Sequence, residues 1–384
     1  MSIEKLFKEI ENIEQHYINF LIDVCNIESP TDYKIGVDKV GKYFIDKAKL
    51  KGWDVEIFSQ PISGDCVCIT LNPNAKGKPV CISGHLDTVH PVGLFHKNST
   101  AIKEDKIYGP GVADCKGGIV AGFMAMDALE KIGFIDRPIK LILQSDEENG
   151  SRFSNKETVN FMAEKAKDCI AFLNAEPFVK GKATTVRKGI KKYSFEITGK
   201  AVHSGVCYTG ISAIKDASYR VIELEKFKEA EGITCNCGII NGGTAENTVP
   251  EKCTITADFR YLTVEQGKTI DEFVIEFAKK TFVEGATCEA ILKSWRYPME
   301  SKQKNVELLE KINKIYADCG LPILESKVSF GGSDAADMTV KGIPCVDSLG
   351  VQGGFPHNLN EFIYTKSLVE SAKRLASVAL CIEG

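Results

Sequence analysis

The chain has 384 residues, of which 43% are hydrophobic and 26% are charged, and its net charge at pH 7 is −4. This composition is typical of a globular protein with a large core, and the length allows two domains. A small negative charge provides no basic surface for nucleic acid, and the longest apolar runs are only as long as strands, so we expect no membrane-spanning segment.

The N-terminal region and the cysteines both bear on location. Residues 1–28 predict an amphipathic helix with interspersed Glu and Lys, unlike the uninterrupted apolar stretch of a secretory signal. Most of the 14 cysteines lie within apolar runs, where a free Cys behaves as a small core residue. We therefore predict reduced cysteines and a cytoplasmic protein.

From residue 35 onwards, helical and strand-like patterns of apolar residues alternate. We predict helices and strands, in chain order, at 35–52 (helix), 53–58, 66–72, 79–83, 117–131 (helix), 139–144 and 169–173. This alternation indicates an α/β fold, with a mixed, mostly parallel sheet and helices on both of its faces.

The pattern changes after residue 186. The predicted elements there are strands near 193–198, 233–240, 252–262 and 286–293, with helices at 211–228 and 264–282. The order β-α-β-β-α-β is that of a ferredoxin-like α+β unit, with helices on one face of an antiparallel sheet.

The first pattern resumes after Trp295, with helices at 303–319 and 365–381 and strands near 322–328 and 343–348. We therefore predict one α/β domain formed by residues 1–186 and 295–384. A smaller domain of residues 187–294 is inserted into it.

Residues that can bind a divalent cation follow four of the predicted buried strands. They are His85, the pair Glu147 and Glu148, Glu176, and His357. Because open α/β sheets carry their chemistry at the carboxyl ends of the strands, we expect these side chains to meet. Each has a simpler explanation when taken alone, such as a strand-end histidine or a solvated acidic turn.

Asp114 lies in a glycine-rich turn before a predicted helix, where a lone Asp would usually be a helix cap. Together with Asp87, Glu147, Glu148 and Glu176, it would place five carboxylates in one cleft. Carboxylates that close together raise one another's pKa steeply, and two divalent cations would neutralise them. Ligands of this kind without thiolates favour zinc, with cobalt or manganese as alternatives.

Four motifs resemble those of the co-catalytic dizinc metallopeptidases. This family includes glutamate carboxypeptidase, aminoacylase, acetylornithine deacetylase, succinyl-diaminopimelate desuccinylase and peptidase T. The motifs are Gly84–Val89, Gly109–Gly118, Asp146–Glu148 and Asn174–Pro177. The resemblance continues in order to His357, and the inserted domain lies where the family has its lid or dimerisation domain.

The resemblance implies a metal-ligand set in which Asp114 bridges two zinc ions. One ion would be bound by His85, Asp114 and Glu176, and the other by Asp114, Glu148 and His357. Glu147 would be the general base, and Asp87 would orient His85. The family often has a second Asp where this chain has Cys115, which leaves open the local backbone geometry, a cis peptide in relatives.

The resemblance also implies substrate-handling groups in and near the inserted domain. His203 resembles the histidine that reaches into a partner subunit's active site to stabilise the oxyanion, which implies a homodimer; a turn histidine is its simpler explanation. Asn247 resembles a substrate-contacting amide. Arg260 resembles a guanidinium that binds a free carboxylate through two hydrogen bonds.

Gly331, Gly332 and Ser333 precede a predicted helix start, where backbone N–H groups can form a nest for a carboxylate. We include these three residues among the candidate substrate contacts.

We predict a dizinc hydrolase that cleaves an amide or peptide bond adjacent to a free carboxylate. Aminopeptidase relatives tend to carry Asp where this chain has Glu176, so the resemblance favours carboxypeptidase or deacylase chemistry. The flanking motifs most resemble the glutamate carboxypeptidase branch, which favours release of a C-terminal amino acid, such as an acidic one, from a short peptide or N-acyl conjugate. An N-acyl-amino-acid deacylase is the alternative enzyme. A catalytically silent metal-binding protein is the alternative from another class, and the presence of Glu147 argues against it.

Overall fold

A computed structural model describes residues 2–95, 99–228 and 232–383. The chain forms two units, each with its own core. The first comprises Met1–Thr185, Ser301–Val328 and Ser333–Gly384, and the second comprises Val186–Glu300 and Ser329–Gly332.

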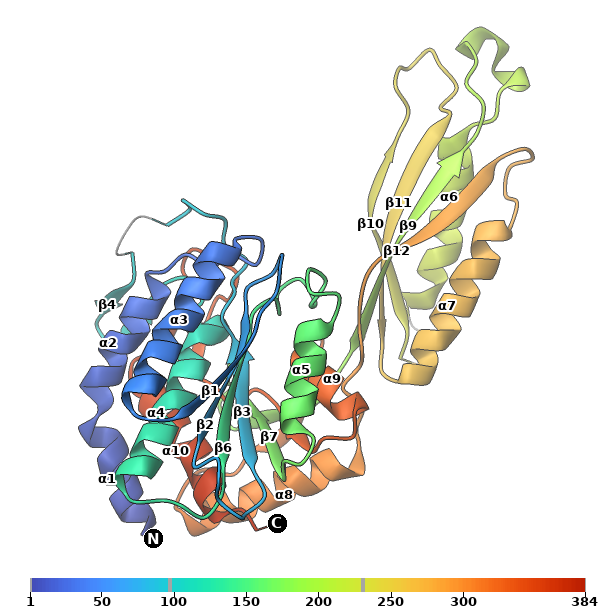
Figure 1. Cartoon of the computed structure of the whole chain (residues 1–384). Coiled ribbons are helices and arrows are strands. Elements are labelled where there is room, and N and C mark those ends of the chain that lie inside the picture. The colour runs from blue at the N-terminus through green and yellow to red at the C-terminus, as the bar shows by residue number, and fades with distance from the viewer. Residues whose placement is uncertain (1, 96–98, 229–231, 384) are drawn as a thin grey trace. The chain divides into compact units, whose positions relative to one another are not determined.

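The first unit is built around a six-stranded sheet (Figure 1). Its strands in spatial order are β1 (Asp54–Phe58), β2 (Cys66–Leu71), β6 (Ile139–Gln144), β3 (Val80–His85), β7 (Ala171–Asn174) and β14 (Cys345–Val346). β6, β3, β7 and β14 run parallel to one another, whereas β1 and β2 are antiparallel to their neighbours. All residues of β2 and β3 are buried, as expected for strands covered on both faces.

Eight helices are described in this unit. They are α1 (Ile3–Asn12), α2 (Glu14–Cys25), α3 (Lys34–Leu50), α4 (Gly117–Lys131), α5 (Glu157–Ala166), α8 (Gln303–Asp318), α9 (Asp334–Val340) and α10 (Lys366–Cys381). Figure 1 shows α4 on one side of the sheet and α5 on the other. α4 is buried along almost its whole length because α10, α1 and α2 pack against it.

A smaller sheet of the first unit has the strand order β15 (Gly353–Gly354), β16 (Phe362–Tyr364), β5 (Lys106–Tyr108) and β4 (Ala101–Lys103). It pairs the C-terminal part of the chain with the segment that leads into a π-helical turn at Val112–Lys116. Two further strands, β8 (Lys182–Arg187) and β13 (Glu325–Ser329), form a two-stranded sheet.

The second unit contains an antiparallel sheet in the order β10 (Thr234–Gly242), β11 (Lys252–Tyr261), β9 (Gly189–Thr198) and β12 (Thr287–Arg296). α6 (Ala213–Leu224) and α7 (Val264–Lys279) pack against it, and short 3₁₀ turns lie at Ser204–Thr209 and Glu225–Lys228. Alternate residues of β11 are buried, so one face of this sheet forms the core beneath the two helices.

The α/β fold class with an inserted α+β unit is confirmed. The single helix predicted over residues 1–28 is wrong, because the structure has two helices separated at Ile13, whose φ and ψ are −99° and 4°. The break allows both α1 and α2 to contact α4. No helix in the described ranges is long and apolar enough to cross a membrane.

Candidate metal centre

Four of the predicted residues lie where strands of the main sheet end at one edge. His85 is the last residue of β3 and is in register with Gln144, the last residue of β6, so Glu147 and Glu148 follow close by. β7 also runs parallel to β3 and ends two residues before Glu176. Apolar strands buried on both faces therefore place these side chains side by side.

Asp114 and His357 reach the same place from the smaller sheet. Asp114 lies in the turn that follows β5, and His357 lies between β15 and β16 with a φ of +63°. Because β16 pairs with β5, the two segments are neighbours despite their separation in sequence. His357 follows β14 along the chain, with the β15 strand between them.

The Asp114 carboxylate lies between two imidazoles, each facing a different oxygen. Asp114 Oδ1 is 3.1 Å from His85 Nε2, and Asp114 Oδ2 is 3.3 Å from His357 Nε2. Glu176 Oε1 is 3.7 Å from His85 Nε2, and Glu148 Oε2 is 3.2 Å from His357 Nε2. The Asp114 carboxylate thus lies beside both histidines, with Glu176 near His85 and Glu148 near His357.

The Asp87 carboxylate lies beneath this cluster and is fully buried. It accepts hydrogen bonds from the backbone N–H groups of Glu147 (3.2 Å) and Glu148 (3.1 Å) and from the Thr31 hydroxyl (2.7 Å). His85 Nδ1 is closer to the backbone oxygen of Asp87, at 2.9 Å, than to its carboxylate, at 3.4 Å. Asp87 therefore fixes the Glu147–Glu148 turn in addition to its contact with His85.

Burial raises the pKa of Glu148 to about 7, against the opposing effect of His357. Burial also raises the pKa of Glu176 well above its usual value, and Asp114 and Glu147 add to that rise. Hydrogen bonds to Asp114 and Glu148 raise the pKa of His357 to about 10. Without metal, Glu148 and Glu176 therefore hold their protons to a higher pH than exposed glutamates do, and His357 stays positively charged to a higher pH than an exposed histidine does. Both effects reduce the negative charge of the cluster.

These residues suit a divalent metal cation. Glu148 Oε1 is buried and has no hydrogen-bond partner among the described residues, so one ligand oxygen is left for an ion. Ligand atoms of His85, Asp114 and Glu148 lie within 4.8 Å of one another. Nitrogen and carboxylate donors of this kind suit zinc, and cations would replace the protons that the cluster retains.

Cys115 also lies close to the predicted metal ligands. Its sulfur lies within 4.8 Å of ligand atoms of His85 and Glu176. Burial raises the pKa of its thiol well above the usual value, and the thiol donates to the backbone oxygen of Ala175 at 3.4 Å. The Asp114–Cys115 peptide bond is cis, which answers the question of local geometry that Cys115 left open.

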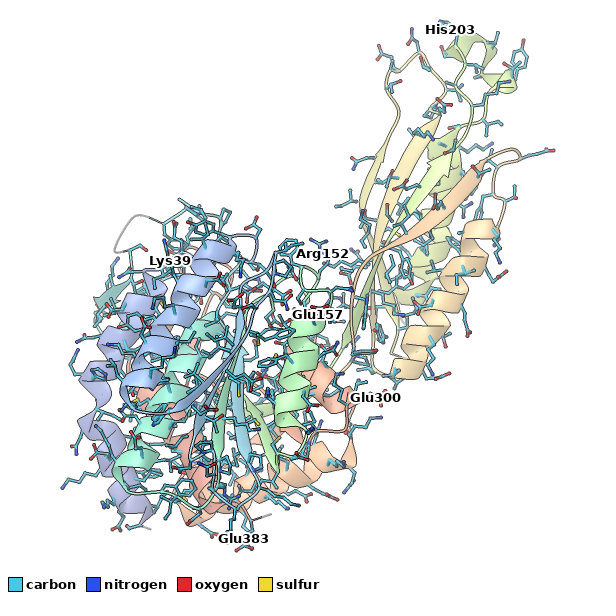
Figure 2. The ribbon with its side chains drawn as sticks, viewed as in Figure 1. Lys39, Arg152, Glu157, His203, Glu300 and Glu383 are labelled. Atoms are coloured by element: carbon cyan, nitrogen blue, oxygen red, sulfur yellow. The ribbon has the colours of Figure 1, made fainter. Side chains whose placement is uncertain are left out.

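His203 and Asn247 lie together at one end of the second unit, where Figure 2 labels His203. His203 forms a β-bridge with Thr248, and the Asn247 carbonyl accepts from the Ser204 N–H at 2.8 Å. Both side chains are exposed. His203 Nδ1 accepts from the Gly205 N–H at 3.1 Å, so in a neutral imidazole Nε2 carries the proton and can donate.

Arg260 lies at the opposite end of β11 and is already paired. Its Nε and Nη2 donate to the two Asp258 oxygens at 2.6 and 3.0 Å, and its Nη1 donates to the Phe330 oxygen at 3.1 Å. A substrate carboxylate would therefore compete with Asp258 for this guanidinium.

The residues of the predicted carboxylate nest lie beside Arg187 and the start of α9. The backbone oxygens of Gly331 and Gly332, which are not the predicted donor groups, accept from Arg187. Ser333 is the N-cap of α9, and its hydroxyl also accepts from the Asn174 side chain at 2.9 Å. The helix start therefore accounts for Ser333 without a ligand.

Glu361 was missed by sequence reasoning. It is 1% exposed, and its carboxylate accepts from backbone N–H groups in the turn that carries Asp114. It follows no long apolar strand, and an Asn-rich loop precedes it, so its sequence context resembles an ordinary surface turn.

The chain is similar to known proteins over most of its length. Residues 81–380 match the family model described as peptidase family M20/M25/M40. Carboxypeptidase G2 of Pseudomonas sp. (strain RS-16) is 28% identical over 367 residues, which cover 93% of this chain and 87% of that protein. A probable succinyl-diaminopimelate desuccinylase of Staphylococcus aureus (strain MRSA252) is 24% identical over 300 residues, or 68% of this chain and 71% of that protein.

Solved structures share the fold. The aminopeptidase PepT of Bacillus cereus superposes with a TM-score of 0.78 at 23% identity, covering 95% of this chain and 98% of that chain. An M20 family metallo-carboxypeptidase of Sulfolobus solfataricus has a TM-score of 0.72 at 19% identity, with the same coverage of 95% and 98%.

Proposed function

Because this chain belongs to peptidase family M20/M25/M40, and is thus a metal-dependent peptidase or amidohydrolase, we propose that it is a dizinc carboxypeptidase. It would release a C-terminal amino acid, such as an acidic one, from a short peptide or N-acyl conjugate. The observation that carries the proposal is the Asp114 carboxylate between His85 and His357, with Glu148 and Glu176 beside them.

We assign His85, Asp114 and Glu176 to one zinc ion and Asp114, Glu148 and His357 to the other. When bound, such ions polarise a substrate carbonyl and make water a better nucleophile. Cobalt or manganese could occupy the same ligands, because imidazole and carboxylate also suit those ions.

Glu147 is the proposed general base. It accepts the proton of the attacking water and returns it to the nitrogen of the leaving amine. Its backbone N–H is hydrogen-bonded to Asp87, as is that of Glu148, so one buried carboxylate sets the orientation of both the base and the adjacent ligand. This supports different tasks for two neighbouring glutamates.

His203 is the proposed donor to the tetrahedral oxyanion, because the hydrogen bond from Gly205 leaves Nε2–H free to donate. Arg260 is the proposed partner of the substrate's free carboxylate. Arg260 lies near the C-terminal end of β11, whereas His203 lies beyond the N-terminal end of that strand, where it bridges Thr248. Lys252, the first residue of β11, and Arg260 are already roughly 25 Å apart at ~3.3 Å per residue. A short substrate could not contact both His203 and Arg260 in one chain, which supports a homodimer in which His203 and Asn247 serve the partner's site.

The substrate class is tested by comparing hydrolysis of N-acyl glutamates, dipeptides and N-acetyl amino acids by the zinc-loaded protein. The similarity to carboxypeptidase G2 over nearly the whole chain and the Glu at position 176 favour release of the C-terminal residue. Preference for removing a small acyl group would instead support the N-acyl-amino-acid deacylase, which the similarity to a probable desuccinylase favours.

A further inference from the structure

We propose that Glu361 is a positioning residue that fixes Asp114 between the two metal ions. This inference rests on the proposed dizinc function, because it concerns the alignment of the bridging ligand. Glu361 itself is not placed to touch metal or substrate, since its carboxylate is occupied by backbone groups and an imidazole.

The contacts of Glu361 surround the turn that carries Asp114. Its Oε1 accepts from the backbone N–H groups of Ala113 at 2.8 Å and Asp114 at 2.9 Å. Its Oε2 accepts from the N–H of Gly111 at 3.1 Å and lies 3.3 Å from His90 Nε2. Burial of a carboxylate is unfavourable unless it is well hydrogen-bonded, and these four contacts provide that compensation.

Glu361 also connects two of the three segments that supply the second ion's proposed ligands, those of Asp114 and His357. It directly precedes β16 and is four residues beyond His357, and its N–H donates to the Asn358 oxygen at 3.0 Å. The N–H of Gly109 donates to the Glu361 carbonyl at 3.3 Å. A displacement of Glu361 would therefore alter the separation of Asp114 and His357.

The contacts require a carboxylate in particular. Three backbone N–H groups face its two oxygens, and a carboxylate presents only acceptors to them. In a Glu361→Gln variant, one oxygen could still accept from Ala113 and Asp114. The amide NH₂ would then face the N–H of Gly111, so that two donors oppose each other and the turn is less well fixed.

The test uses the full-length protein, stripped of metal, and measures zinc affinity by competition with a chromophoric chelator. We expect Glu361→Gln to bind both zinc ions about 10- to 100-fold more weakly, the range typical for loss of a group that orients a metal ligand. Cobalt-loaded protein provides a second readout, because distortion of the ligands should change the visible absorption bands of the bound ions.

Asp216→Asn is the matched control. Asp216 is a fully buried carboxylate in the second unit that accepts from Arg220 and from the Val283 N–H. Its loss should lower the melting temperature and leave zinc affinity unchanged. If Asp216→Asn weakens zinc binding as much as Glu361→Gln does, the effect is general destabilisation and the inference is wrong.

The inference is also wrong if Glu361→Gln is folded, by circular dichroism, and binds zinc within twofold of the wild type. If that variant does not fold, Glu361→Asp decides by the same readouts, because it keeps both acceptor oxygens on a side chain one methylene shorter. A wild-type protein that binds no zinc would contradict the proposed dizinc function itself. Wild-type zinc binding that Glu361→Gln leaves unchanged would contradict only the role of Glu361, so the two failures are distinguishable.

Discussion

At the scale of single residues, Asp87 explains how two adjacent glutamates can have different tasks. Its carboxylate accepts from the backbone N–H groups of both Glu147 and Glu148, which fixes the turn on which they lie. The Glu148 side chain is then directed to His357, with 3.2 Å between Oε2 and Nε2. Glu147, on the same turn, is the proposed general base.

Glu147→Gln should abolish turnover while leaving about two metal ions per chain, because the amide cannot accept the proton of water and Glu147 is outside the proposed ligand set. Elemental analysis and steady-state kinetics on the same preparation would measure both quantities. Glu148→Gln is the comparison, since it should lose metal as well as activity. Substantial turnover by Glu147→Gln would exclude the role of general base.

The metal-free protein should become less stable as the pH rises. The pKa of His357 is raised from 6.5 to about 10 in the folded state, so its stabilising contribution is complete below pH 6.5 and is lost towards pH 10. Glu148 changes stability in the same direction between pH 4.5 and about 7. Thermal melts of metal-free protein should therefore show a falling melting temperature over these ranges.

Bound zinc should reduce this fall, because cations replace the protons. His357→Gln should reduce it between pH 6.5 and 10 in the metal-free protein. An identical pH dependence in the wild type and His357→Gln would show that this histidine does not couple to the carboxylates.

At the scale of elements, the sequence predicts the ligands that follow long buried strands. β3, β6 and β7 are almost entirely buried and rich in apolar residues, so the positions of His85, Glu148 and Glu176 at one sheet edge could be inferred. The smaller sheet could not be inferred, because β15 and β16 have two and three residues and show no periodicity. Its pairing with β5 is a long-range contact that brings His357 to Asp114.

The side-chain contacts of Arg260 and His203 in the second unit could not be inferred from the sequence either, because they also depend on three-dimensional structure. The strands could be predicted from their alternation, but the pairing of Arg260 with Asp258 depends on side-chain conformation. Likewise, the hydrogen bond from Gly205 to His203 that directs Nε2–H outward depends on a short 3₁₀ turn.

Arg260→Ala should weaken binding of substrates with a free carboxylate by ~1.5–3 kcal/mol, or about 10- to 150-fold, if one charged hydrogen-bonded contact is lost. Inhibition constants for paired free and amidated product analogues would measure the difference. Lys192→Ala is a matched control, because Lys192 also lies near Asp258, at 3.9 Å, on the neighbouring strand. Equal losses with the amidated analogue would contradict a carboxylate contact.

At the scale of the whole molecule, the separation of His203 and Arg260 along β11 predicts that active sites are shared between subunits. A mixture of Glu147→Gln and His203→Ala chains, each inactive alone, should recover activity when they form heterodimers. One of the two sites in each heterodimer would then have both an intact Glu147 and an intact partner His203. Random pairing predicts about a quarter of the wild-type activity.

Co-expression of the two variants with different affinity tags would allow the heterodimer to be purified and assayed. Light scattering on the same fractions would establish the oligomeric state. A catalytically competent monomer, or an inactive heterodimer, would contradict the shared site.

The most direct test of the proposed dizinc centre is anomalous X-ray diffraction from zinc-loaded crystals, measured on both sides of the zinc absorption edge. If Asp114 bridges two ions, two zinc peaks should appear, one on each side of its carboxylate, with His85 and Glu176 at one and Glu148 and His357 at the other. A single peak, or peaks that do not contact Asp114, would contradict the central claim that this carboxylate bridges two ions.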